Sequence, residues 1–254
     1  MKNLFALFLA YLTPFTMAAA QTCTKQSPAH TVALLELYTS EGCSSCPPAD
    51  KAVSALRRAA QQDLVVPLSL HVDYWDYIGW TDRFAKPQFT QRQRQLAEAI
   101  NSRAVYTPEI FLGGAEFRNW SGNLEDRIGQ VNRQAARADI GIELTPAKGG
   151  KLPVTVSAKS GQDGNLYIAL YENGLSSNVR AGENSGVLLR HDFVVRDWIG
   201  PFAVQAGTNG AQAVFRQSIP IPAASSPAEL GVAAFIQDTH GQVLQALALP
   251  LCGT

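Results

Sequence analysis

The segment Cys43-Ser44-Ser45-Cys46-Pro47-Pro48 lies between an apolar, β-favouring run (31–38) and a stretch with apolar residues at helical spacing (48–61). Proline is tolerated in the first turn of a helix, because the N–H that it lacks has no partner there. Two thiols three positions apart at a strand-to-helix turn are typical of a redox motif. A second apolar run (63–72) completes a strand–helix–strand unit with two parallel strands.

The remaining chain divides into two kinds of pattern. Helices are expected over 84–99 and 124–138, with a hairpin at Gly113-Gly114 between them, and the polar residues 91–95 are expected on a solvated face. From residue 139 onward, short β-rich runs alternate with turns rich in glycine, proline and serine, which favours an antiparallel sandwich. These runs are 140–144, 152–158, 165–172, 187–195, 212–221, 230–237 and 243–249. We therefore predict an α/β domain over 25–138 and an all-β sandwich-like domain over 139–254, α+β overall.

The amino-acid composition narrows the classes of function that this protein could have. The 254 residues are 46% hydrophobic and 17% charged, and the net charge is zero. These values are ordinary for a globular protein, and no basic stripe indicates a nucleic-acid partner. The chain shows no glycine loop for phosphate, no nucleophile elbow and no paired Cys-x-x-Cys of a zinc site, so no cofactor is predicted.

The first twenty residues resemble a secretory signal peptide. Lys2 precedes an apolar run (4–12), and Ala18-Ala19-Ala20 fits a small-residue cleavage site. The alternative is a membrane anchor, but the run falls short of the roughly 20 residues that a span needs. We predict cleavage after residue 20, a periplasmic or secreted location, and no membrane span in the mature chain.

The cysteine count suits an oxidising compartment, in which disulfides persist. Four cysteines allow three pairings. The close pair Cys43–Cys46 is the natural motif pair, which leaves Cys23 with Cys252. That bridge would close almost the whole chain and contribute about 5 kcal/mol in the chain-entropy model. The alternative is that Cys23 and Cys252 are separate free thiols.

The motif pair carries the predicted chemistry. A thiolate attacks disulfides, and the positive end of a helix stabilises it. Cys43 is therefore expected to be the exposed nucleophile and Cys46 the resolving thiol. Glu36, on the preceding strand, is a candidate proton acceptor for Cys46, or else a strand-edge or salt-bridged glutamate. The alternative for the pair itself is an inert structural disulfide.

Several other polar and aromatic residues each have two possible roles. His71 is either a core histidine or, with Cys43 and Cys46, part of a Cu(I) site, because soft thiolates bind that ion. Tyr74 and Trp75 either line a peptide groove or belong to the core. In the C-terminal half, the segments 172–177 and 182–186, the second of which contains Asn184, are typical of turns. The alternative is that Glu183, Arg190 and His191 form a polar site that faces the thiol domain.

The strand–Cys-Ser-Ser-Cys-Pro–helix–strand arrangement, followed by Thr107-Pro108 and a short β-run, resembles the thioredoxin superfamily. That resemblance implies a cis peptide at Pro108, which packs beside the cysteines, and a substrate-binding backbone at Thr107. A narrower likeness covers the segments 36–50, 71–76, 182–186 and 189–191. They are similar to a bacterial exported family called domain of unknown function 1223.

Together these observations predict an exported protein that exchanges disulfides through Cys43 and Cys46. Its partners would be protein thiols or disulfides, or a redox partner protein. Two alternatives remain: a periplasmic copper-handling module that uses Cys43, Cys46 and His71, and a catalytically silent interaction protein of the cell envelope.

Overall fold

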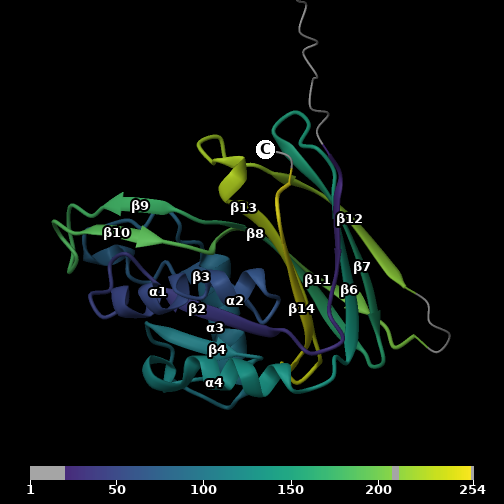
Figure 1. The fold of residues 1–254 in the computed structure, drawn as a ribbon. Coiled ribbons are helices and arrows are strands. Elements are labelled where there is room, and N and C mark those ends of the chain that lie inside the picture. Colours follow the sequence, from purple (N-terminus) through teal and green to yellow (C-terminus); the bar gives the residue numbers. More distant parts are fainter. Residues whose placement is uncertain (1–20, 208–211, 253–254) are drawn as a thin grey trace, which may run out of the picture.

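A mixed eight-stranded sheet forms the centre of the protein (Figure 1). The computed structural model describes residues 21–207 and 212–252, so the expected signal peptide lies outside the described residues. In order across the sheet, the strands are β14 (Val243–Pro250), β13 (Leu230–Gln237), β8 (Gly164–Glu172), β11 (Val194–Val204), β3 (Val65–His71), β2 (Ala33–Thr39), β4 (Glu109–Leu112) and β5 (Ala115–Glu116).

Two parallel pairings organise this sheet around the cysteine motif. Strands β2 and β3 run parallel with Thr39 opposite His71, as the strand–helix–strand pattern predicts. Strand β11 is parallel to β3 at Val194 and Ser69 and antiparallel to β8. Strands from both sides of residue 139 therefore share one sheet, which the sequence pattern does not indicate.

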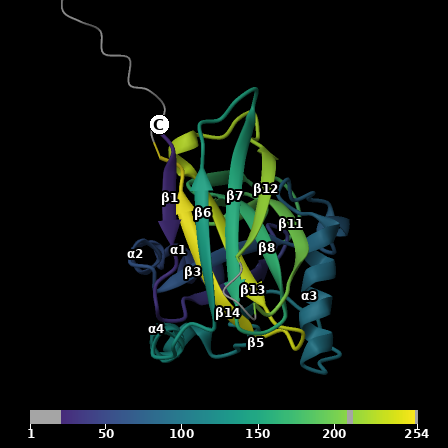
Figure 2. The same ribbon diagram turned by 90° about the vertical axis from the view of Figure 1, so that its right-hand side faces the viewer.

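A second, antiparallel sheet covers β8, β13 and β14 (Figure 2). Its strands are β1 (Cys23–Gln26), β6 (Ala138–Leu144), β7 (Lys151–Ser160) and β12 (Ala213–Pro220). Along β7 every second side chain is buried, which is the pattern of a strand with one face on the core. An apolar core that includes Val156, Ile168 and Leu247 lies between the two sheets. The predicted α+β class and the antiparallel strands after residue 139 are confirmed.

The helices depart from their predicted bounds in ways that matter for the site. They are α1 (Pro47–Ser54), α2 (Arg57–Gln61), α3 (Pro87–Ala99) and α4 (Trp120–Asn132), with short 3₁₀ turns at Asp76–Ile78 and Pro227–Glu229. The single helix expected over 48–61 is broken at Leu56. Its N–H donates to the carbonyl of Val53, three residues earlier, whereas an α-helix would require the carbonyl four residues earlier. On α3, Arg92 and Gln93 are buried, so the expectation of a solvated polar face is wrong for these two.

A two-stranded hairpin of the C-terminal half lies over helix α1 (Figure 1). Its strands are β9 (Leu175–Asn178) and β10 (Leu188–His191). The run expected as one strand over 187–195 is thus divided between β10 and β11. The loop between β9 and β10 reaches the cysteine motif.

Two disulfides are present, Cys23–Cys252 and Cys43–Cys46, as predicted. The first joins the beginning of β1 to the residues that follow β14. Within the described part of the chain, no helix is both long enough and apolar enough to span a bilayer.

Candidate thiol–disulfide site

The Cys43–Cys46 disulfide sits in the turn between β2 and α1, at the amino-terminal end of the helix. Cys46 donates its N–H to the carbonyl of Cys43 at 3.2 Å, and its own carbonyl accepts the N–H groups of Ala49 and Asp50. Both cysteines are fully buried, whereas Ser44 and Ser45 between them are exposed. The expected exposure of Cys43 is therefore absent from this disulfide form, because other parts of the chain cover it.

The loop between β9 and β10 is hydrogen-bonded to the cysteine turn. The side-chain amide of Asn184 donates to the carbonyl oxygens of Glu41 (2.9 Å) and Cys43 (3.0 Å). The carboxylate of Glu183 accepts the N–H (3.0 Å) and the hydroxyl (2.7 Å) of Ser44. For these two residues the structure shows a polar contact with the thiol motif. Arg190 remains exposed.

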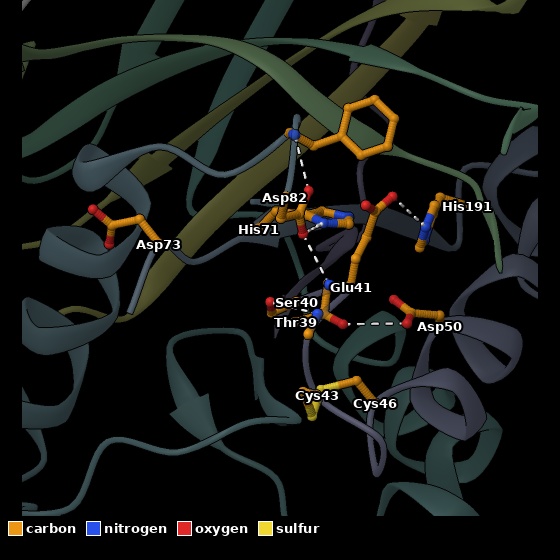
Figure 3. A network of polar contacts seen from close by, with 12 residues as sticks. Thr39, Ser40, Glu41, Cys43, Cys46, Asp50, His71, Asp73, Asp82 and His191 are labelled. Carbon is orange, nitrogen blue, oxygen red and sulfur yellow. Dashed lines mark hydrogen bonds and ion pairs between the residues drawn. A yellow bond between two sulfur atoms is a disulfide. The ribbon is translucent and has the colours of Figure 1, made fainter. Parts of the chain in front are cut away.

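Five ionisable side chains form a buried cluster behind the disulfide: Glu41, Asp50, His71, Asp82 and His191 (Figure 3). The ring nitrogen Nδ1 of His71 donates to the carboxylate of Asp82 at 2.6 Å. The Oε1 atom of Glu41 lies 3.3 Å from Nε2 of His191, and its other oxygen accepts the indole N–H of Trp80 at 2.8 Å. The hairpin thus contributes His191 to a cluster otherwise built near the ends of β2 and β3.

Within this cluster His71 and Asp82 each favour the charged form of the other. Burial alone would lower the pKa of His71, but the adjacent Asp82 carboxylate raises it above its ordinary value. Burial alone would raise the pKa of Asp82, and His71 lowers it. Burial likewise opposes ionisation of Glu41, whereas the nearby imidazole of His191 holds the pKa of Glu41 below its usual range.

Asp50 is the member of the buried cluster nearest in sequence to the thiols. It lies four residues after Cys46 on α1, and the hydroxyl of Thr39 donates to its Oδ2 atom at 3.2 Å. Burial raises the pKa of Asp50, and the nearby imidazoles of His191 and His71 offset only part of that effect. A buried carboxyl group with a raised pKa beside a thiol can hold a proton.

The geometry does not support a Cu(I) site made of Cys43, Cys46 and His71. In residues 21–207 and 212–252, no three histidine, cysteine or acidic side chains are arranged to hold a metal ion. The sulfur atoms of Cys43 and Cys46 are bonded to one another, and His71 is engaged by Asp82 through Nδ1. Its ring also packs edge-on against Phe84 and His191, as in a core histidine.

Glu36 lies on the opposite face of the sheet from the thiol helix. Arg92 of α3 donates to both of its carboxylate oxygens, at 3.0 and 3.1 Å, and the hydroxyl of Tyr38 also approaches Oε1 at 3.4 Å. Side chains alternate between faces along a strand. Because Thr39 contacts Asp50 of α1, Glu36 faces α3 instead. Glu36 is thus a salt-bridged glutamate that pairs with Arg92.

The Thr107–Pro108 peptide is cis and immediately precedes β4. Since Tyr38 is opposite Glu109 in the antiparallel β2–β4 pair, Pro108 falls beside Thr39, at the motif end of the sheet. A hollow of about 440 Å³ extends from Pro108 and is lined by Tyr106, Phe117, Arg118 and Trp120 among others. The structure therefore places Thr107 and Pro108 close to the cysteine turn.

Tyr74 and Trp75 are half-buried and pack against the core of the large sheet. The hydroxyl of Tyr74 donates to Gln93 at 3.2 Å, and Gln93 donates to Glu109 at 2.6 Å. Burial of Glu109 raises its pKa to about 7. A carboxyl group that titrates near neutral pH thus follows Pro108 directly, and the sequence did not indicate it.

The comparisons with known proteins agree with this architecture. Residues 34–237 match the model of a protein family described as "Protein of unknown function (DUF1223)". The chain belongs to this family. The crystal structure of a structural-genomics target from Agrobacterium tumefaciens is 26% identical, with a TM-score of 0.66 over 89% of this chain and 96% of that one. No curated protein matches the chain in sequence.

Sequence reasoning overlooked three members of the buried cluster: Glu41, Asp50 and Asp82. One signal was available, because residues four apart on a helix share a face, and Asp50 stands four positions after Cys46. For Glu41 and Asp82 the sequence holds no comparable signal, since their partners come from distant segments.

Proposed function

We propose that this DUF1223 protein is an exported, thioredoxin-like thiol–disulfide exchange protein that acts on a protein thiol or disulfide through Cys43 and Cys46. One observation carries the proposal: the Cys43–Cys46 disulfide lies at the amino-terminal end of α1, and Pro108 precedes β4 at the same end of the sheet. A helix start stabilises a thiolate, which is the reactive form in exchange.

In this proposal a thiolate of the partner attacks Cys43, the first sulfur, and Cys46 leaves. The hollow beside Pro108, with its aromatic lining, offers room for residues that flank the partner's sulfur. The reverse reaction reduces a partner disulfide, with Cys43 as the attacking thiolate and Cys46 as the resolving thiol.

The test is turnover with a disulfide-containing protein such as insulin, across a range of glutathione ratios. Cys43→Ser should abolish exchange, whereas Cys46→Ser should accumulate a mixed disulfide at Cys43. Cys23→Ser/Cys252→Ser serves as the control, and it should retain exchange. A wild-type protein that shows no exchange at any glutathione ratio would refute the proposal.

A second function has one observation in its favour. Both motif cysteines are fully buried, and the β9–β10 loop is hydrogen-bonded to their turn, as in a disulfide that only holds the structure closed. A catalytically silent interaction protein of the envelope would have such a bridge. Its reduction potential would then lie below about −300 mV, where the glutathione pool does not reduce it.

A further inference from the structure

We propose that Asp50 is the proton carrier for Cys46, giving a proton to its sulfur when the disulfide opens and taking it back when the disulfide closes. This inference rests on the proposed function and names the acid–base group of that same site. Asp50 thereby takes the proton-transfer role that the sequence suggested for Glu36, and it lies on the same face of the sheet as Cys46.

Position on the helix supports this assignment. The N–H of Asp50 donates to the carbonyl of Cys46 at 3.1 Å, so the two residues are one helical turn apart. Side chains at this spacing share a face, with Cβ atoms about 5–6 Å apart. Both residues are buried, and Figure 3 shows Asp50 between the disulfide and His191.

The reaction balances with Asp50 as the acid. The thiolate of the partner bonds to the Cys43 sulfur, the Cys43–Cys46 bond breaks, and its electron pair goes to the Cys46 sulfur. The carboxyl group of Asp50 then gives its proton to that sulfur and becomes a carboxylate. When a mixed disulfide is resolved, the Asp50 carboxylate takes the proton from Cys46. The Cys46 thiolate then bonds to the Cys43 sulfur, the bond from Cys43 to the partner breaks, and the partner leaves as a thiolate.

The surroundings of Asp50 suit a group that changes its charge. Three elements packed on α1 contribute polar groups near Asp50: Thr39 from β2, His71 from β3 and His191 from β10, with Glu41 and Asp82 behind them. The nitrogen Nε2 of His71 and both ring nitrogens of His191 are buried without a hydrogen bond, as is Oε1 of Glu41. These imidazoles are available to stabilise an Asp50 carboxylate after it has given up its proton. Because these groups interact, their protons are shared in coupled steps.

The decisive experiment follows single-turnover opening of the Cys43–Cys46 disulfide by reduced glutathione between pH 5 and 9, with rates divided by the thiolate fraction of glutathione. In the wild type the corrected rate should fall as pH rises, because the protonated acid disappears. Asp50→Asn should remove this inflection and open about 100-fold more slowly at low pH. The exposed Asp126, changed to Asn, is the matched control and should behave as the wild type.

A second variant keeps the test valid if Asp50→Asn does not fold. Thr39→Val removes the hydrogen bond to the Asp50 carboxylate, so the inflection should move to higher pH. An unmoved inflection in Thr39→Val, or an inflection that persists in Asp50→Asn, overturns the assignment. In a Cys43→Ser background, Asp50→Asn should also lower the pKa of the Cys46 thiol, since a neighbouring carboxylate disfavours a thiolate.

These outcomes are separable from the proposed function. Insulin turnover reports whether the protein exchanges disulfides with proteins, and the glutathione profile reports which group carries the Cys46 proton. A wild type that opens with glutathione and shows the Asp50 inflection, yet never turns over protein disulfides, would refute the function and retain the assignment.

Discussion

Asn184 binds the backbone of Cys43. Its side-chain amide, on a loop 141 positions further along the chain, donates to the Cys43 carbonyl at 3.0 Å. A second hydrogen bond from the same amide reaches Glu41, and both Asn184 and the cysteine are buried. In the proposed function a partner thiolate must reach the buried Cys43 sulfur, and we infer that the β9–β10 loop moves to admit it. Such a movement would couple access to the disulfide to the β9–β10 hairpin.

Asn184→Ala should therefore speed reduction of Cys43–Cys46. Two neutral hydrogen bonds of about 1 kcal/mol each hold the loop, so their loss should raise the open fraction about 30-fold. The measurement is the rate of reduction by a trialkylphosphine, followed by thiol labelling, together with amide hydrogen exchange over residues 180–187. Exposed Asn178 of the same hairpin, changed to Ala, is the control. Equal rates in both variants would show that the loop does not limit access.

The Glu36–Arg92 pair predicts a loss of stability without a loss of exchange. Glu36→Gln leaves the Arg92 guanidinium buried without its charge partner, which should cost about 3 kcal/mol of unfolding free energy. Urea unfolding measures this cost, and exposed Glu143→Gln is the matched control. The rate of disulfide exchange should stay within about twofold of the wild type, because Glu36 faces α3. A large loss of exchange at unchanged stability would instead place Glu36 in the chemistry.

The elements around the Cys43–Cys46 motif could be predicted from the sequence because the residues that indicate each element are neighbours in the chain. Apolar runs, the prolines after Cys46 and the Gly113-Gly114 pair predict β2, α1, β3 and the β4–β5 hairpin from neighbouring residues alone. The parallel pairing of β11 with β3 joins residues more than a hundred positions apart, and no local period encodes it. Arg92 illustrates the same limit, because an arginine that alternates with glutamines along 91–95 is expected to be solvated until Glu36 is seen opposite it.

The two disulfides should contribute very differently to stability. Cys23–Cys252 closes a loop with a sequence separation of 229, whereas Cys43–Cys46 has a separation of 3. In the chain-entropy model, Cys23→Ser/Cys252→Ser should lower the unfolding free energy by about 5 kcal/mol, and Cys43→Ser/Cys46→Ser by about 2 kcal/mol. Denaturant titration of both double variants checks this order. The reverse order would mean that the motif disulfide is the main structural bridge.

Glu109 should make the protein less stable as pH rises through neutrality. Its pKa is about 7 in the folded protein, against an ordinary value of 4.5, because the group is buried. Between these two values the folded state binds the proton and the unfolded state does not, so stability falls with increasing pH. The full effect, about 2 to 3 kcal/mol, is reached above pH 7 and is absent below about pH 4.5.

Glu109→Gln removes this ionisation and keeps an oxygen that can accept the hydrogen bond from Gln93. The variant should match the wild type near pH 4.5 and exceed its unfolding free energy by about 2 kcal/mol at pH 8. Unfolding curves at both pH values provide the measurement, and Glu125→Gln on the exposed side of α4 is the control. A constant difference between wild type and Glu109→Gln at the two pH values would show that Glu109 does not titrate near neutrality. The position beside Pro108 makes the result relevant to the site, since an ionised Glu109 would add negative charge next to the hollow that we assign to the partner.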